Sequence, residues 1–323
     1  LAMGEFDLIA RIRARCLPRP DVLLGIGDDA ALLHVPSNCA LCVSVDTLIA
    51  GVHFPRDTAA YSVGWKALAV NLSDMAAMGA KPMWATLALT LPEPDCAWLD
   101  GFLDGFFALA QAEAVALVGG DTTRGPLSIT VTIHGLVAAE KALRRDAARV
   151  GDVIAVSGTL GDAAAGLRID QLSASGGDHA YLRSRLDCPT PRVALGQFLA
   201  GRARAAVDIS DGLLADLQHV LSASGLGADI EVDALPSSEA LREAVVNPHD
   251  RTQLQCSGGD DYELLFTLSI EAWQEVCAEA ERQAWQVTVI GRVSADTGLR
   301  LWQDGKQNAL PETAGWNHFG DSS

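Results

Sequence analysis

Acidic residues recur beside glycines and other small residues in this sequence, and their side chains are well suited to binding cations. In "GIGDDAALL" (residues 25–33), Asp28 and Asp29 follow a Gly-x-Gly and run into apolar residues. The combination returns in "VSVDTL", "NLSDMAAMG", "LVGGDTTRG", "VDISDGL" and "SGGDDYEL", which contain Asp46, Asp74, Asp121, Asp208, Asp211, Asp260 and Asp261. Carboxylates that converge in a site shielded from water cannot all remain ionised unless cations bind between them. Mg²⁺ prefers such hard oxygen ligands together with phosphate oxygens, so the pattern predicts acids that hold metal ions, which in turn hold a nucleotide.

The alternative for each motif is structural, because Asp-Gly pairs are common in turns. Asp74 resists this interpretation, since it interrupts a helix of small residues that otherwise has the composition of a buried one. The joint pattern is also hard to explain by turns alone.

The elements that must position these acids alternate between strands and helices. The segment "NCALCVSVDTL" predicts a buried strand ending at Asp46, and "VALVGG" predicts a strand that Asp121 follows. Asp74 falls on the helix predicted from "AAYSVGWKALAVNLSDMAAMGA". A later helix, "DGLLADLQHVLSAS", is expected to have Ser210 or Asp211 near its cap. In open α/β folds, loops at strand ends form the ligand crevice.

The length of 323 residues favours two domains. The alternation pauses at the charged connector "AEKALRRDAARVGD" and restarts with "VIAVSG". We therefore predict an α/β (α+β) protein with domains at residues 1–140 and 141–323.

Charge and composition restrict the partners. The formal net charge of −17 argues against nucleic acid, whose phosphates select basic surfaces. No apolar run approaches the roughly 18 residues of a membrane span. Seven scattered cysteines are typical of reduced thiols, which predicts a cytoplasmic protein. Cys39 and Cys42 form a C-x-x-C, for which core packing is favoured over metal or redox use.

Three familiar enzyme classes lack support. "GIGDDA" imitates a dinucleotide fingerprint, but it leads into a strand rather than a helix, and its acids would repel pyrophosphate. No P-loop motif is present. Neither H-E-x-x-H nor G-x-S-x-G occurs, which disfavours zinc proteases and serine hydrolases.

The motifs together resemble one family. "GEFDLIARI", "GIGDDAALL", "SVDTLIAGVHF", "KALAVNLSDMAAMGAKP", "GGDTTRGPLSITVTIHG", "DISDGL", "GGDDYEL" and "GWNHF" follow one another along nearly the whole chain. In this order they resemble the thiamine-monophosphate kinases, of the superfamily that includes aminoimidazole ribonucleotide synthetase and selenophosphate synthetase. "GVHF" and "GGDTTRG" point to the thiamine kinase branch.

The resemblance implies a fold, an activity and a set of site residues. It implies a ferredoxin-like N-terminal domain that dimerises through its sheet and binds ATP and Mg²⁺, and an α/β C-terminal domain that completes the site. The implied reaction is ATP-dependent, Mg²⁺-assisted, direct in-line phosphorylation of thiamine phosphate to thiamine diphosphate, with several Mg²⁺ ions and ATP as co-substrate. The implied metal ligands are Asp29, Ser44, Val45, Asp46, Asp74, Asp121, Asp208 and Asp211, of which Asp74, Asp121 and Asp211 are central to catalysis. Gly120, Asp121, Arg145 and Ser210 are implied to contact ATP, and His53, Asp260 and Trp316 to contact thiamine phosphate.

Two positions depart from the family pattern. Asp260 stands where relatives often have Glu, and Val45 where they often have Thr, so a role for Val45 falls to its backbone carbonyl. Two alternatives remain open from the residues: another ATP-using enzyme of the superfamily, such as an aminoimidazole ribonucleotide synthetase, and a non-catalytic divalent-cation or nucleotide-binding protein.

Overall fold

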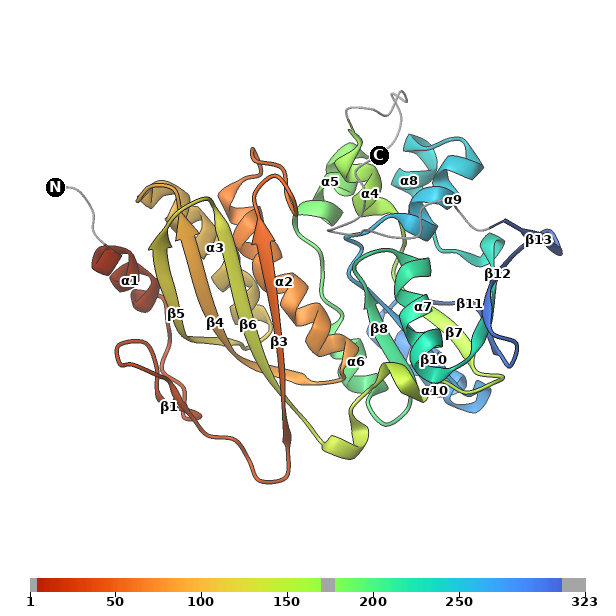
Figure 1. Ribbon diagram of the computed structural model, residues 1–323, viewed down its shortest axis with the longest axis horizontal. Coiled ribbons are helices and arrows are strands. Elements are labelled where there is room, and N and C mark those ends of the chain that lie inside the picture. The colour runs from red at the N-terminus through yellow and green to blue at the C-terminus, as the bar shows by residue number, and fades with distance from the viewer. Residues whose placement is uncertain (1–4, 170–177, 310–323) are drawn as a thin grey trace. The chain divides into compact units, whose positions relative to one another are not determined.

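The structure is a computed structural model that describes residues 5–169 and 178–309 (Figure 1). It divides into two compact units, each described here by itself. Unit 1 comprises residues 1–75 and 80–141, and unit 2 comprises residues 76–79 and 142–323. The expected two-domain α/β architecture is confirmed.

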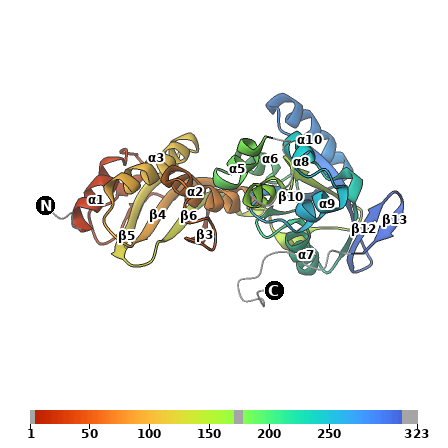
Figure 2. The ribbon, with the colours of Figure 1, turned by 90° about the horizontal axis from the view of Figure 1, so that it is seen from above.

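Unit 1 is a four-stranded sheet with two long helices on one face (Figure 2). The sheet has the order β3-β6-β4-β5, with β4 and β5 parallel and the other pairs antiparallel. Its elements are β3 (Ala40–Ile49), α2 (Ala60–Ala77), β4 (Lys81–Leu91), α3 (Cys96–Ala112), β5 (Ala116–Arg124) and β6 (Ser128–Val137). Before them come α1 (Glu5–Ala14), β1 (Val22–Leu24) and β2 (Leu32–Leu33), and η1 (Ala139–Lys141) follows. The chain order β-α-β-α-β-β differs from the expected ferredoxin-like order, β-α-β-β-α-β.

The two helices pack very closely at two glycines. A Cβ on Gly64 of α2 would lie 1.9 Å from the carbonyl oxygen of Phe102, and one on Gly105 of α3 would lie 1.9 Å from that of Tyr61. The absence of side chains here lets the backbones approach. Phe102 and Phe106 are fully buried in the resulting core.

Two expected strand boundaries in unit 1 are wrong. β3 continues past Asp46 to Ile49, and β5 includes Asp121 rather than ending before it. Both acids therefore lie on strands and not in loops. β3 is also an edge strand exposed at alternate residues, not a buried one: its exposed positions are Leu41, Val43, Val45, Thr47 and Ile49.

Unit 2 is built on a seven-stranded sheet of order β13-β12-β9-β11-β7-β10-β8, in which only the β12–β9 pair is parallel. The strands are β7 (Val153–Ser157), β8 (Ala205–Ile209), β9 (Gly227–Glu231), β10 (Glu263–Leu268), β11 (Val287–Ser294), β12 (Gly298–Gln303) and β13 (Lys306–Asn308). The helices are η2 (Arg145–Ala147), α4 (Asp162–Leu167), α5 (His179–Asp187), α6 (Val193–Leu199), α7 (Leu213–Ser224), η4 (Val232–Ala234), α8 (Glu239–Ala244), α9 (Pro248–Ser257) and α10 (Ile270–Gln283).

Helices α7 and α10 lie on opposite faces of this sheet (Figures 1 and 2). Leu213, Leu217 and Val220 of α7 are fully buried against the strands. The cap of α7 differs from the expectation: Gly212 is the N-cap, and Ser210 and Asp211 precede the helix. The φ of 122° at Gly212 explains this, since side-chain residues rarely adopt it.

Within the described ranges, no helix combines the length and the apolar character needed to cross a membrane.

Candidate active site

Two predicted metal ligands, Asp46 on β3 and Asp74 on α2, lie together in unit 1. Burial, the charge of Asp74 and a hydrogen bond with Asp74 raise the pKa of Asp46 to about 7. The hydroxyl of Ser44, two residues along the same strand face, donates to Oδ2 of Asp74. Close carboxylates oppose each other's ionisation unless a proton or a cation lies between them. This part of the predicted metal set is therefore brought together.

Val45 and Asp29 are placed differently. The side chain of Val45 is 57% exposed on the opposite face of β3, so only its backbone is available beside Ser44 and Asp46. Asp29 is exposed in the segment between β1 and β2, where its N–H donates to Oδ1 of Asp28 over 2.9 Å. Metal binding by either residue stays a prediction.

Asp121 lies on the far edge of the same sheet. The register aligns it with Ala88, Thr130 and Thr47, on the face opposite to Asp46. Three strand spacings separate β3 from β5, or about 14 Å. One ion cannot be bound by both Asp46 and Asp121 in this arrangement.

Gly120, the predicted nucleotide contact beside Asp121, has a clear structural requirement. A Cβ at this position would lie 1.9 Å from the carbonyl oxygen of Leu87 on β4, and its φ is 153°. Glycine is therefore needed for β4 and β5 to pair here.

His53 lies in the turn that follows β3. Its ring Nδ1 accepts a hydrogen bond from the backbone N–H of Ile49 over 3.0 Å. The backbone N–H of His53 donates to the carbonyl of Ile49, also over 3.0 Å. Nδ1 is therefore unprotonated, and a proton on the neutral ring belongs to Nε2. Lys66 donates to the backbone carbonyl of His53 over 3.3 Å.

In unit 2, the segments "DISDGL" and "GGDDYEL" are joined by backbone hydrogen bonds. Asp260 donates its N–H to the carbonyl of Ser210 over 2.9 Å, and Tyr262 donates to that of Ile209 over 2.8 Å. Asp208 is buried on β8 opposite Leu264, and Asp211 follows the strand half-buried. The structure thus brings together the predicted contacts Asp208, Ser210, Asp211 and Asp260.

Arg144 and Arg145 are distinguished by their contacts. Arg144 makes a two-pronged ion pair with Asp146, with donor–acceptor distances of 2.8 and 2.6 Å. Arg145 is exposed, and its guanidinium has no partner among the residues that the structure describes. This difference favours Arg145 as the residue available for a ligand. Trp316, the remaining predicted contact, lies outside the described residues.

Family models of the AIR synthase related protein match residues 27–137, the N-terminal domain, and residues 149–304, the C-terminal domain. Thiamine-monophosphate kinase of Salmonella typhimurium is 48% identical over 324 aligned residues, which cover 99% of this chain and 98% of that protein. The chain belongs to the thiamine-monophosphate kinase family.

Solved structures of thiamine-monophosphate kinases agree. The enzyme from Stenotrophomonas maltophilia superimposes with a TM-score of 0.86 at 51% identity, covering 95% of this chain and 99% of that one. AaThiL complexed with AMPPCP and TMP gives a TM-score of 0.77 at 34% identity, covering 98% of this chain and 97% of that one.

The donor set of this thiamine-monophosphate kinase family member fits a hard cation. Asp46, Asp74 and the hydroxyl of Ser44 present oxygen ligands only, and the raised pKa of Asp46 reflects its burial and the nearby charge of Asp74. No group of three or more His, Cys, Asp or Glu side chains in the described part of the chain is arranged to hold a metal. Oxygen ligands of this kind suit Mg²⁺, which retains waters and shares phosphate oxygens with its ligand.

Sequence reasoning missed Asp216, which organises the loop between β8 and α7. Its Oδ2 accepts hydrogen bonds from three consecutive N–H groups, those of Ser210 (3.0 Å), Asp211 (3.0 Å) and Gly212 (3.2 Å). Burial and the charge of Asp211 raise its pKa to about 7. An acid between Leu214 and Leu217, on the buried face of an apolar helix, was the signal available in the sequence.

Sequence reasoning also missed a buried polar network beside "GGDDYEL". Asp261 and Glu263 are 1% and 0% exposed, and they bind Arg185, Arg192 and the N–H of Gly161. Two acids around a tyrosine, leading into an apolar strand, indicated buried charge in need of partners.

Proposed function

We propose that this chain transfers the γ-phosphoryl group of ATP to the phosphate of thiamine monophosphate, giving thiamine diphosphate and ADP. The observation that carries the proposal is its full-length similarity, at 34% identity, to AaThiL complexed with AMPPCP and TMP. Relatives of higher identity over the same length are thiamine-monophosphate kinases.

The chemistry requires positioning and charge neutralisation rather than a general base. The acceptor oxygen belongs to a phosphate that is already anionic at neutral pH. Attack on the γ-phosphorus breaks its bond to the β,γ-bridging oxygen, and ADP leaves with the electron pair. The residues of the chain therefore have to bind two polyanions and align them in line.

The proposed cofactor is Mg²⁺, as several ions. Asp46, Asp74 and Ser44 in unit 1 are the best-supported ligands, and Asp29, Val45 (through its carbonyl), Asp121, Asp208 and Asp211 complete the proposed set. Magnesium supplies neutralisation of phosphate charge when bound. Asp74, Asp121 and Asp211 are the proposed catalytic members.

On the ATP side we assign Gly120, Asp121, Arg145 and Ser210. The guanidinium of Arg145 is exposed and has no partner among the described residues, which supports its role toward phosphate. On the acceptor side we assign His53, Asp260 and Trp316. An acid and an aromatic ring suit the cationic, flat thiazolium of thiamine.

The proposal includes a homodimer formed through the sheet of unit 1. Leu41, Val43, Val45 and Ile49 lie on one face of edge strand β3, with Thr47 between the last two, and are 48%, 53%, 57% and 41% exposed. A row of exposed apolar side chains on a sheet is suited to covering by a second copy.

We also propose a cytoplasmic location: all seven cysteines lie within the described residues, and all are free thiols.

The deciding experiment incubates the protein with ATP, Mg²⁺ and thiamine monophosphate, with a magnesium-free control, and separates the products by chromatography. We expect metal-dependent thiamine diphosphate, formed one-for-one with ADP. ADP without thiamine diphosphate would point to another enzyme of the superfamily. Bound ATP with no turnover would point to a nucleotide-binding protein.

A further inference from the structure

The loop that carries Asp260 has an unfavourable backbone conformation at two residues. Asp260 has φ 68° and Tyr262 has φ 48°, in the left-handed region that non-glycine residues rarely adopt. Such residues persist where the surrounding structure holds them in place, and they concentrate at functional sites. The contacts that hold this loop are therefore of functional interest.

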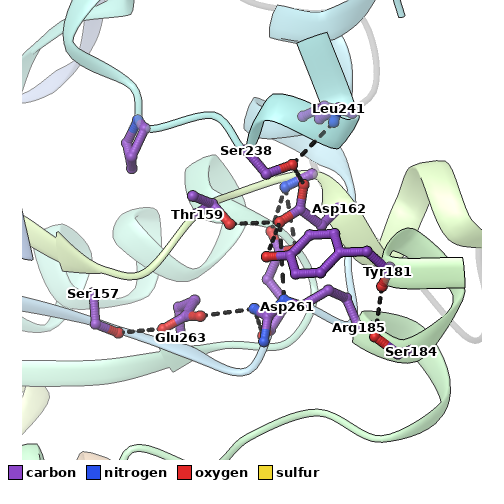
Figure 3. Close-up of polar contacts among 12 residues, drawn as sticks. Ser157, Thr159, Asp162, Tyr181, Ser184, Arg185, Ser238, Leu241, Asp261 and Glu263 are labelled. Atoms are coloured by element: carbon purple, nitrogen blue, oxygen red, sulfur yellow. Dashed lines mark hydrogen bonds and ion pairs between the residues drawn. The ribbon is translucent and has the colours of Figure 1, made fainter. Parts of the chain in front are cut away.

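Asp261, between these two residues, anchors the loop in the interior of unit 2 (Figure 3). Both of its carboxylate oxygens accept from the N–H of Gly161, at 2.9 and 3.1 Å. Its backbone carbonyl accepts from Nη2 of Arg185 over 3.3 Å. The side chain of Asp261 is buried, whereas Asp260 before it is partly exposed.

Arg185 connects this anchor to Glu263 at the start of β10. The same Nη2 donates to Oε1 of Glu263 over 2.7 Å. Arg192 binds both oxygens of Glu263, at 2.6 and 2.5 Å. Burial lowers the pKa of Arg185, but the charges of Glu263 and Asp261 outweigh it and raise that pKa, so the guanidinium is firmly charged.

Asp162, at the start of α4, braces the other side of the anchor. It accepts from the hydroxyls of Thr159 and Ser238, each over 2.5 Å, and from that of Tyr181 over 3.4 Å (Figure 3). Nε of Arg185 lies 3.9 Å from its Oδ2. These contacts hold the turn at Gly161, which presents its N–H to Asp261.

A network of this kind is an inefficient source of stability, because desolvating the charges offsets their attraction. What it supplies is a fixed geometry for the backbone that it holds. We propose that Arg185 is a positioning residue for Asp260: by binding the carbonyl of Asp261 and the carboxylate of Glu263, it holds the strained 260–262 backbone that presents Asp260 to the cationic acceptor. This inference rests on the proposed function for the role of Asp260, but the restraint on the loop does not.

The restraint is tested by hydrogen exchange of the full-length protein. In Arg185→Lys, which keeps the charge but not the fork of donors, we expect the amides of Asp260 and Tyr262 to exchange at least tenfold faster. Arg183→Lys is the matched control: it lies on the same helix, binds only Asp187 among its described partners, and should leave these amides unchanged. Arg192→Lys is the substitute variant if Arg185→Lys does not fold. It perturbs the same network through Glu263, and we expect it to give a smaller increase in the exchange rate of these amides. Unchanged exchange at both amides in the folded variants would overturn the proposal.

The positioning role is tested by a double-mutant cycle. Arg185→Lys should raise KM for thiamine monophosphate about tenfold while KM for ATP changes less than twofold. In the Asp260→Ala background it should have no further effect on KM for thiamine monophosphate. Additive effects, or a fall in kcat with both KM values unchanged, would show a merely structural role and overturn the assignment. A wild-type protein that forms no thiamine diphosphate would instead overturn the proposed function, while the exchange result still decides whether Arg185 restrains the loop.

Discussion

Asp46 on β3 and Asp74 on α2 share a hydrogen bond, and burial together with the charge of Asp74 raises the pKa of Asp46 to about 7. The two residues are 28 positions apart in the sequence. They meet because α2 packs on the helix-covered face of the unit 1 sheet. Their mutual repulsion is a cost that a cation would relieve. This relationship is the strongest structural support for the proposed metal site.

Replacing Asp74 by Asn should lower kcat for phosphoryl transfer at least about 100-fold, while leaving the fold intact. The change removes one charge and little volume. Without metal, the variant should be at least as stable as the wild type, because a like-charge contact is lost. Thermal unfolding with and without Mg²⁺ checks this: Mg²⁺ should raise the Tm of the wild type more than that of the variant. Near-normal activity would contradict the metal assignment.

Replacing Asp216 by Ala should disorder the loop at residues 210–212. Three backbone donors would lose their acceptor, for which we expect a loss of about 2–3 kcal/mol in the free energy of unfolding and a higher KM for ATP. Asp216→Asn, whose amide oxygen can still accept, should be much milder. Chemical denaturation and steady-state kinetics measure the two effects, with Gln218→Ala as an exposed control on the same helix. Equal effects of the Ala and Asn variants would refute the hydrogen-bonding explanation.

Replacing Val43 by Asp should shift the protein from dimer to monomer. A charge in the exposed apolar row of β3 would be costly to bury against a second copy, whereas in the monomer it faces water. Light scattering coupled to size-exclusion chromatography measures the mass. The dimer proposal fails if the wild type is monomeric at micromolar concentration, or if the variant dimerises equally well.

The ion pair between Asp229 and Arg300 predicts a pH dependence of stability. Hydrogen bonds from Arg300 lower the pKa of Asp229. The stabilisation is therefore fully present above the unfolded pKa of about 4 and is lost as the pH falls through the lower folded value. Asp229→Asn should cost about 1 kcal/mol at pH 7, and the difference from wild type should shrink toward pH 3. Denaturation at both values measures it, with Glu231→Gln on the same strand as a control. A difference independent of pH would contradict the ion-pair explanation.

Local patterns in the sequence determined much of the architecture. The apolar spacing of residues 60–77 predicted the first long helix of unit 1, and the restart of the alternation at β7 (153–157) and the helix at 213–224 were also anticipated. These predictions succeed because periodicity follows from which face of an element is buried. Motif order along the chain was likewise sufficient to recognise the family.

Tertiary structure alone decided which functional groups meet. The strand register put Asp121 on the face opposite to Asp46, although both have similar local sequences. Asp261 accepts a hydrogen bond from the N–H of Gly161, 100 positions away in the chain. Glu263 binds Arg185 and Arg192, each more than 70 positions away. A local sequence contains no information about such partners, because they are set by how distant segments pack and by the need of each buried charge for a counterion or donor.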